Sequence, residues 1–201
     1  MAYKDYAEFN AAKEACRDCY VGKTYNKVIP SDGCKNPKVL IIGEAPGNLE
    51  VEQGKPFVGR AGKLLRVTLS KHGFNETNSL ISNVLPCRPE GNKFPKEEDI
   101  VEACVNKWLM QEIELVKPKY ILLVGSTSLY YLLKIRGITV NRGKWFYLSK
   151  EQQETGEGVQ CMPTYHPSYV LRKMYMTEGK QILEHFENDI KEVAIKAGIY
   201  K

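Results

Sequence analysis

The stretch KVLIIG at Lys38–Gly43, followed by the turn residues EAPG, decides the fold. A short apolar run that ends in a Gly/Pro turn is typical of a strand buried on both faces. Outward along the chain, three further runs predict strands, at Leu80–Leu85, Tyr120–Val124 and Val159–Thr164. The polar residues Gln152–Gly158 lie between two strand-like segments and predict a hairpin excursion.

Helical patterns separate these strands. Apolar residues recur at helical spacing from Ala61 to His72, and Gly73 follows as a stop signal. The other predicted helices are Lys96–Val116, Ser126–Ile135 and Gln181–Ala197. Strands alternating with helices predict the α/β class, with a mostly parallel sheet covered on both faces. No repeat or long linker divides the chain, so we expect residues 1–201 to form a single domain.

The composition excludes some classes of protein. No apolar run reaches the ~18 residues of a membrane span, and the N-terminus lacks an apolar signal core, so we expect a cytoplasmic protein with no membrane partner. The net charge of +5 suits a polyanion but does not by itself require one. Six cysteines in such a chain leave metal ligation, catalysis or burial rather than disulfides.

The segments after the strands are where function is expected. In open parallel sheets, ligands bind outside the carboxyl ends of the strands. Polar, Gly, Pro or His residues are concentrated after three of the four predicted strands, in Gly43–Gly47, Pro86–Pro95 and Tyr165–Tyr169.

The cysteine spacing leaves three readings open. Cys16 and Cys19 form a CxxC, Cys87 follows a predicted strand, and Cys104 lies on the next predicted helix. A CxxC presents two thiolates on one turn, which suits zinc or an iron–sulfur cluster, although plain burial of the thiols is also consistent with the spacing. Burial is the expectation for the remaining pair, Cys34 and Cys161.

Three motifs carry a resemblance to a known family. GEAPGNLEVEQGKPFVGRAGKLL at 43–65, NVLPCRP at 83–89 and HPSYVLR at 166–172 resemble, in order, motifs of the family 4 uracil-DNA glycosylases. The resemblance implies a three-layer α/β/α fold with a four-stranded parallel sheet. It implies a monofunctional DNA glycosylase that flips uracil out of DNA and hydrolyses its N-glycosidic bond. It also implies a 4Fe–4S cluster held by Cys16, Cys19, Cys87 and Cys104.

The same resemblance assigns the catalytic pair. Glu44 is expected to stabilise positive charge on the sugar and to orient the attacking water. His166 is expected to donate a hydrogen bond to uracil O2, where negative charge collects.

Four further residues are expected to bind the base. Asn83 would read the uracil edge with its amide, and Phe57 would stack on the flipped ring. Glu50 would lie near uracil C5 and obstruct a thymine methyl. Ala45 is also expected to lie near the base; relatives in another glycosylase family carry an Asp at this place, so no general base is assigned there. Val51 departs from the acidic residue usual at its position.

The expected partner is uracil-containing DNA, bound by a monomer. Gly59 and Gly62 would let the backbone approach phosphates, and Tyr169, Leu171 and Arg172 form the segment expected to enter the duplex. Additional backbone contacts are expected from Arg88, Lys93 and Lys173.

Three alternatives remain in view. One is a relative that becomes covalently attached to uracil-containing DNA through a His in an inserted loop, but RPEGNKFPKEED contains no His. Another is a non-catalytic DNA-binding or replication-accessory protein on the same fold, which would not need Glu44, Asn83 and His166 together. The last is a nucleoside-binding enzyme, for which a segment that enters DNA would serve no purpose.

Overall fold

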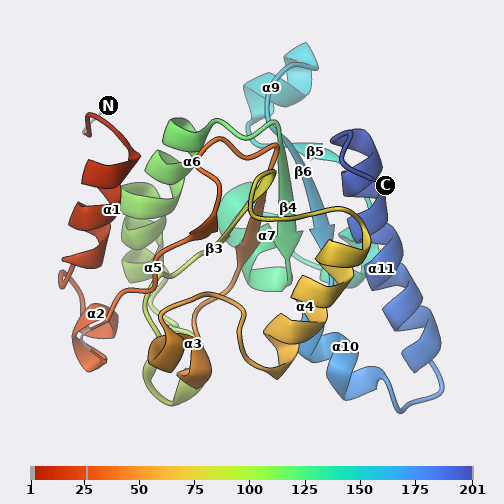
Figure 1. The fold of residues 1–201 in the computed structure, drawn as a ribbon, viewed down its shortest axis with the longest axis horizontal. Coiled ribbons are helices and arrows are strands. Elements are labelled where there is room, and N and C mark those ends of the chain that lie inside the picture. Colours follow the sequence, from red (N-terminus) through yellow and green to blue (C-terminus); the bar gives the residue numbers. More distant parts are fainter. Residues whose placement is uncertain (1–2, 26, 201) are drawn as a thin grey trace.

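A six-stranded sheet forms the centre of the computed structural model, which describes residues 3–25 and 27–200 (Figure 1). The strand order is β1-β3-β2-β4-β6-β5, with β1 (Asp32–Gly33), β2 (Val39–Gly43), β3 (Ser79–Asn83), β4 (Tyr120–Val124), β5 (Phe146–Tyr147) and β6 (Gln160–Thr164). The four longer strands are parallel, as predicted. The structure corrects the strand count, because two-residue strands pair antiparallel at both edges, where they are too short to leave a periodic pattern.

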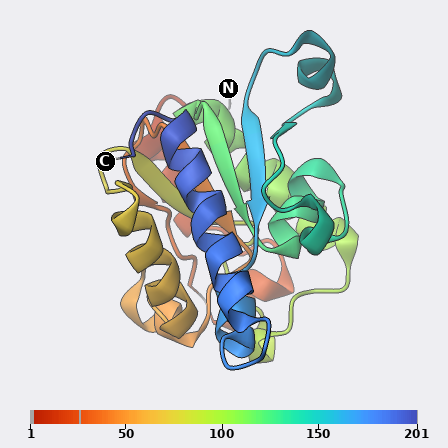
Figure 2. The same cartoon turned by 90° about the vertical axis from the view of Figure 1, so that its right-hand side faces the viewer.

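Helices cover both faces of this sheet (Figures 1 and 2). The first half of the chain contains α1 (Tyr6–Glu14), α2 (Tyr20–Thr24), α3 (Asn48–Gln53), α4 (Arg60–Lys71), the 3-10 turn η1 (Glu90–Asn92) and α5 (Glu98–Cys104). After a π-helical turn η2 (Val105–Leu109) come α6 (Met110–Val116), α7 (Ser126–Leu133), α8 (Ile138–Asn141), α9 (Lys150–Thr155), α10 (Pro167–Lys173) and α11 (Gly179–Lys196). The helix predicted at Lys96–Val116 is therefore α5, η2 and α6 in succession, and it begins two residues later than expected.

Alternate residues of each parallel strand face opposite layers. Val39 and Ile41 of β2 pack into a core with α4, α10 and α11, whereas Leu40 and Ile42 pack into a second core with α5, η2, α6 and α7. The strands are fully buried because both faces are covered. This confirms the predicted α/β/α layering.

The register aligns the carboxyl ends of the parallel strands. Gly43 of β2 lies opposite Asn83 of β3, and Val124 of β4 lies opposite Thr164 of β6. The residues that follow these strands are therefore brought to one end of the molecule, where a ligand site is expected.

A buried polar network fixes α1 to the rest of the molecule. The carboxylate of Glu112 on α6 accepts hydrogen bonds from Lys13 Nζ at 3.1 Å, Tyr6 Oη at 2.7 Å, Ser31 Oγ at 2.6 Å and Ser82 Oγ at 2.7 Å. Burial alone would raise the pKa of Glu112, but Lys13 and the hydroxyl donors more than offset it and hold the pKa below its ordinary value. The two charges of this interior cluster, on Lys13 and Glu112, are thus paired with each other within the fold.

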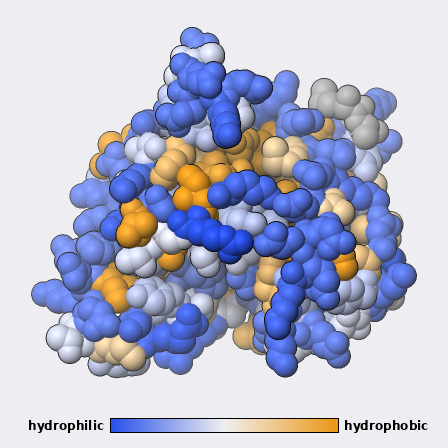
Figure 3. Space-filling model, turned by 180° about the vertical axis from the view of Figure 1, so that it is seen from behind, coloured by the Kyte–Doolittle hydropathy of each residue, from blue (hydrophilic) through white to orange (hydrophobic). Residues whose placement is uncertain are grey.

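The predicted hairpin excursion is present and contains a helix. β5 pairs antiparallel with β6, and α9 lies between them, projecting from the body of the molecule (Figure 1). Seen from behind, hydrophilic residues cover most of the surface and hydrophobic ones form small patches (Figure 3). None of the described helices combines the length and apolarity needed to cross a membrane.

Candidate active site

Glu44 follows β2 directly and is held from two sides. Its backbone carbonyl accepts the amide hydrogen of Leu85 at 3.0 Å, which extends the strand pairing past the end of β3. Its carboxylate oxygen Oε2 accepts a hydrogen bond from the hydroxyl of Thr127, in the first turn of α7. No described residue hydrogen-bonds Oε1, so this oxygen is available to a ligand or a water.

His166 follows β6 and caps the N-terminus of α10. Its Nδ1 accepts the backbone N–H of Ser168 at 3.2 Å and lies 2.7 Å from the hydroxyl of the same residue. The Ser168 hydroxyl in turn accepts a hydrogen bond from Arg172 at 3.3 Å. Because Nδ1 accepts the amide hydrogen, the proton of a neutral imidazole must lie on Nε2.

The surroundings of His166 favour the neutral ring. Burial lowers its pKa; nearby Glu44 acts in the opposite direction, and the Arg172 cation reinforces the lowering. The imidazole is therefore a neutral hydrogen-bond donor at physiological pH.

One pocket contains both groups. It has a volume of about 340 Å³, and its wall comprises Glu44, Gly125, Ser126, Ile138, Thr139, Tyr165, His166, Ser168, Tyr169 and Arg172. Gly125 has φ +100°, and a Cβ atom there would lie 3.0 Å from Cβ of His166. Only glycine combines this backbone conformation with so close an approach to the imidazole.

Phe57 and Asn83 meet beside Gly43. A Cβ atom on Gly43 would lie 2.3 Å from Cζ of Phe57 and 2.6 Å from Oδ1 of Asn83, so both side chains pack directly over this glycine. The Phe57 ring lies 6.3 Å from the His166 ring, with 36° between their planes. The structure thus places two of the four residues predicted to bind the base, Phe57 and Asn83, together beside Gly43, with Phe57 close to His166.

The backbone of Phe57 is strained and tightly packed. Its φ of +54° is in the left-handed region, which costs a non-glycine residue about 1–3 kcal/mol. A Cβ atom on Gly62 would come within 2.1 Å of the Phe57 carbonyl carbon, so only glycine fits at that position of α4. We find Gly62 packed against Phe57, and Gly59 at the N-cap of α4.

Two charged side chains hold the Phe57 segment in this conformation. The carboxylate of Glu50 accepts the amide hydrogens of Val58 at 2.9 Å, Gly59 at 2.8 Å and Gly47 at 3.0 Å. All three bonds are to backbone, so Glu50 supports the loop; its predicted contact with the base stays a prediction.

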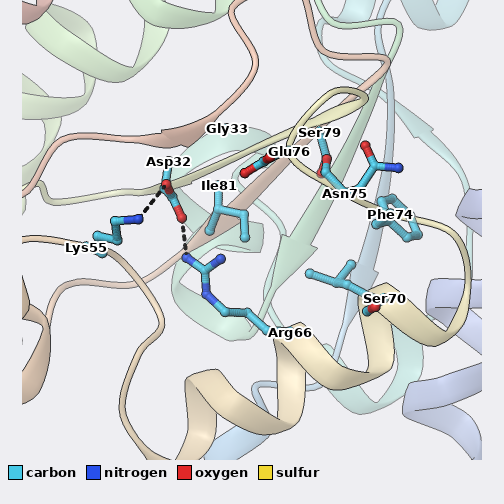
Figure 4. A pocket seen from close by; sticks show the side chains of 11 residues that line it. Asp32, Gly33, Lys55, Arg66, Ser70, Phe74, Asn75, Glu76, Ser79 and Ile81 are labelled. Carbon is cyan, nitrogen blue, oxygen red and sulfur yellow. Dashed lines mark hydrogen bonds and ion pairs between the residues drawn. The ribbon is translucent and has the colours of Figure 1, made fainter.

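The second charged side chain that holds the Phe57 segment is Arg66 on α4. Arg66 donates from Nε to the carbonyl of Phe57 at 3.0 Å and from Nη2 to that of Pro56 at 2.7 Å. Asp32 on β1 pairs with the same Nη2 at 2.6 Å and also faces Lys55 (Figure 4). These groups line a separate pocket of about 440 Å³. These hydrogen bonds of Arg66 were not predicted from the sequence, because Arg66 and Asp32 are 34 residues apart and form no local motif.

Two of the remaining predicted residues line the pocket, and the others lie elsewhere. Tyr169 and Arg172 line the pocket, and Leu171 is half-buried on the same helix. Ala45 packs its methyl group against the core that contains α5 to α7. Lys93 is exposed.

Arg88 and Lys173 already have protein partners. Arg88 hydrogen-bonds the side-chain oxygens of Asn48 and Asn92, both at 2.8 Å, and Lys173 pairs with Glu178 at 3.1 Å. Their predicted DNA contacts would have to form in addition to these bonds.

The four predicted cysteine ligands gather at one place. Cys16, Cys19 and Cys104 line a pocket of about 290 Å³, and Cys16 and Cys19 pack against an apolar cluster that contains Cys87. Burial, together with the neighbouring thiolates, raises the pKa of Cys87 and of Cys104 to about 12. A cationic group would be needed to keep these thiols ionised.

The structure also bears on groups of side chains that could hold a metal ion and on the remaining cysteines, Cys34 and Cys161, which differ in burial. In the parts of the chain that the structure describes, no group of three or more His, Cys, Asp and Glu residues is arranged to hold a metal ion. Cys161 is fully buried on β6, as predicted, whereas Cys34 is only half-buried.

Comparisons with known proteins place these features in a family. The family described as "Uracil DNA glycosylase superfamily" matches residues 30–191. The type-4 uracil-DNA glycosylase of Sulfurisphaera tokodaii is 35% identical over 90% of this chain and 81% of its own length. Those of Pyrobaculum aerophilum and Archaeoglobus fulgidus are 37% and 33% identical, over 79% and 92% of this chain and over 80% and 89% of their own lengths.

Proposed function

Because this chain belongs to the uracil DNA glycosylase superfamily, we propose that it excises uracil from DNA by hydrolysing the N-glycosidic bond and leaving an abasic site. The observation that carries the proposal is the pocket shared by Glu44 and His166, with Phe57 and Asn83 beside it. In this proposal Glu44 stabilises the positive charge that develops on the sugar, and His166 stabilises the negative charge on the departing base.

His166 stabilises the leaving group. With Nδ1 occupied by Ser168, the Nε2–H of the neutral ring donates to uracil O2 as negative charge develops there. A preorganised donor of this kind contributes roughly 3 kcal/mol to the transition state. Because burial already lowers the pKa of His166, the ring donates without first having to lose a proton.

Glu44 acts on the sugar. The Thr127 hydroxyl fixes one carboxylate oxygen, which leaves the other to face the oxocarbenium-like sugar carbon and to orient the attacking water. A carboxylate in this position stabilises positive charge that exists only in the transition state, which is the requirement for catalysis.

Recognition of uracil is assigned to the groups over Gly43. The Asn83 amide accepts from uracil N3–H and donates to O4, a pattern that cytosine cannot match, and Phe57 stacks on the ring. Glu50 restricts the space near C5, and Ala45 leaves room beside Glu44.

The DNA itself would be bound around the mouth of the pocket. Gly59, at the N-cap of α4, would contact phosphates, while buried Gly62 would let α4 pack against Phe57 beside them. Tyr169, Leu171 and Arg172 would enter the duplex at the flipped nucleotide, whose extrusion costs about a few kcal/mol. We take residues 1–201 to act as one domain and as a monomer.

Cys16, Cys19, Cys87 and Cys104 would hold a 4Fe–4S cluster. Two observations support such a group: the four thiols lie around one apolar site, and burial raises the pKa of two of them, Cys87 and Cys104, so that a cation would be needed to keep those two ionised. When bound, the cluster would supply a rigid link between the N-terminal segment and the segment after β3, because hydrolysis of an N-glycosidic bond needs no electron transfer.

A non-catalytic DNA-binding role is not favoured. Such a protein would have no need for Glu44, Asn83 and His166 in one place, nor for the strained Phe57 beside them.

The direct test uses a labelled oligonucleotide with one uracil, treated with alkali after incubation. Wild-type protein should give strand cleavage, and Glu44→Ala combined with His166→Leu should not. Absence of cleavage by well-folded wild type carrying its cluster, seen as absorbance near ~400 nm, would exclude uracil as the substrate.

A further inference from the structure

The loop between α10 and α11 exposes three consecutive apolar side chains. Met174 is 37% exposed, Tyr175 83% and Met176 52%, so this loop contributes three of the nine large hydrophobic residues exposed among the described residues. Tyr175 is the most exposed of the nine, and no described residue makes a hydrogen bond or ring contact with it. Three consecutive exposed apolar side chains differ from the scattered single ones that are normal on a protein surface.

The loop has a defined shape. The amide of Met176 donates to the carbonyl of Lys173 at 2.8 Å, and the amide of Gly179 donates to that of Met176 at 2.9 Å, which makes two successive turns. The Lys173–Glu178 ion pair at 3.1 Å closes the loop from outside. A Cβ atom on Gly179 would lie 2.4 Å from the Lys173 carbonyl oxygen, so these turns require glycine there. A partner therefore meets a preorganised surface.

The loop also lies at the functional end of the molecule. It projects below α10 and α11 in both ribbon views, at the end toward which β4 and β6 run (Figures 1 and 2). His166 caps the start of α10, and the seven residues of this helix place its far end ~10 Å away. With stacked nucleotides 3.4 Å apart on a strand, this distance corresponds to about three nucleotides.

The charge around the loop fits a nucleic acid. Arg172, Lys173 and Lys180 lie in or beside it, and Glu178 is the one acidic residue between positions 171 and 181, where it is paired with Lys173. Aromatic and apolar side chains interleaved with cations are typical of surfaces that bind unpaired bases and the backbone next to them.

We propose that Met174–Met176 is a binding platform for an unpaired base of the DNA strand, on which Tyr175 stacks about three nucleotides from the flipped uracil. The proposal rests on the proposed glycosylase function and extends the DNA contact beyond Tyr169, Leu171 and Arg172. It makes the strand beside the target part of the recognition site, so an opened or single-stranded flank binds better than a paired one.

The test compares Tyr175→Ala and Tyr175→Phe in the full-length protein, with Ile195→Ala as a matched truncation of an exposed apolar residue at the far end of α11. The substrates are single-stranded uracil oligonucleotides that carry 2-aminopurine at successive positions on either side of the uracil. One series of oligonucleotides extends beyond the third nucleotide on each side of the uracil. The other series ends at the nucleotides adjacent to the uracil and so lacks the base that Tyr175 would bind.

We expect wild type, Tyr175→Phe and Ile195→Ala to change the 2-aminopurine fluorescence at one position near the third nucleotide, and Tyr175→Ala to lose this change. Tyr175→Ala should raise KM for the long substrate about fivefold or more, without changing kcat, and leave KM for the short substrate unchanged. Equal fluorescence and equal KM in Tyr175→Ala and wild type would overturn the proposal. So would a Tyr175-dependent dimer in sedimentation without DNA. Failure of the glycosylase function would appear differently, as no excision by any of the four proteins.

Discussion

The two residues proposed to be catalytic are held in place by opposite means. His166 is oriented by its own helix, through Ser168 and Arg172, which are two and six residues further along the chain. Glu44 is oriented by Thr127, which is 83 residues away on another helix. The first arrangement is complete within one motif, whereas the second exists only after β2 and β4 have paired. One pocket therefore depends both on hydrogen bonds between residues close in sequence and on one between distant residues. Mutations can remove each kind separately.

Replacing the charge of Glu44 while keeping its position should have the largest effect. In Glu44→Gln, the amide oxygen can still accept from Thr127, but the negative charge facing the sugar is lost. We expect kcat to fall roughly 100-fold, with little change in KM, in a single-turnover excision assay. A loss of less than threefold would show that position alone, rather than charge, is what Glu44 provides.

Removing the hydrogen bond from Thr127 to Glu44 should have the next largest effect on kcat. Thr127→Val keeps the shape of the side chain and deletes the donor to Glu44, so we expect kcat to fall about tenfold. Thr127→Ser, which retains the hydroxyl, should restore most of the rate. If the valine and serine variants are equally slow, packing of the methyl group rather than the hydrogen bond is responsible.

Removing the Ser168 hydroxyl beside His166 should lower kcat less. Ser168→Ala deletes the hydroxyl beside Nδ1 of His166 but keeps the backbone N–H that binds the same nitrogen. We expect about a threefold loss in kcat, smaller than in Thr127→Val, because the ring keeps one of its two partners. The opposite ranking of these two variants would show that the hydroxyl of Ser168 matters more to catalysis than the hydrogen bond from distant Thr127.

The smallest effect should be a displacement of the pH profile. The Arg172 cation contributes to the lowered pKa of His166, so Arg172→Ala should raise that pKa. The neutral ring is the proposed active form, so kcat of the variant should decline at a higher pH than kcat of wild type as the solution is acidified. The midpoint of the acidic limb of kcat measures this, independently of any change in DNA affinity. An unchanged midpoint would show that burial alone sets the pKa.

The sequence predicts the parts of this molecule that local patterns encode. The runs at β2, β4 and β6 predict parallel strands, and the alignment of the carboxyl ends of β2 and β6 then predicts that Glu44 and His166, which follow them, approach one another. The CxxC similarly predicts that Cys16 and Cys19 act together.

Features that depend on contacts between distant segments escaped prediction. Edge strands β1 and β5 have two residues each and exist only because a neighbouring strand pairs with them. Likewise, nothing near Arg66 in the sequence signals that its guanidinium will bind Asp32 and two carbonyls of the Phe57 loop. The left-handed φ of Phe57 depends on such contacts too, because an isolated peptide would relax it.

The interior network around Glu112 also determines the order in which the molecule is built. Lys13 precedes Glu112 by 99 residues, so α1 cannot acquire its permanent anchor until about half of the chain has been synthesised. At about 5–20 residues per second, the wait is roughly 5 to 20 s. Docking of the N-terminal segment is therefore a late event in the biogenesis of this protein, although its residues are among the earliest made.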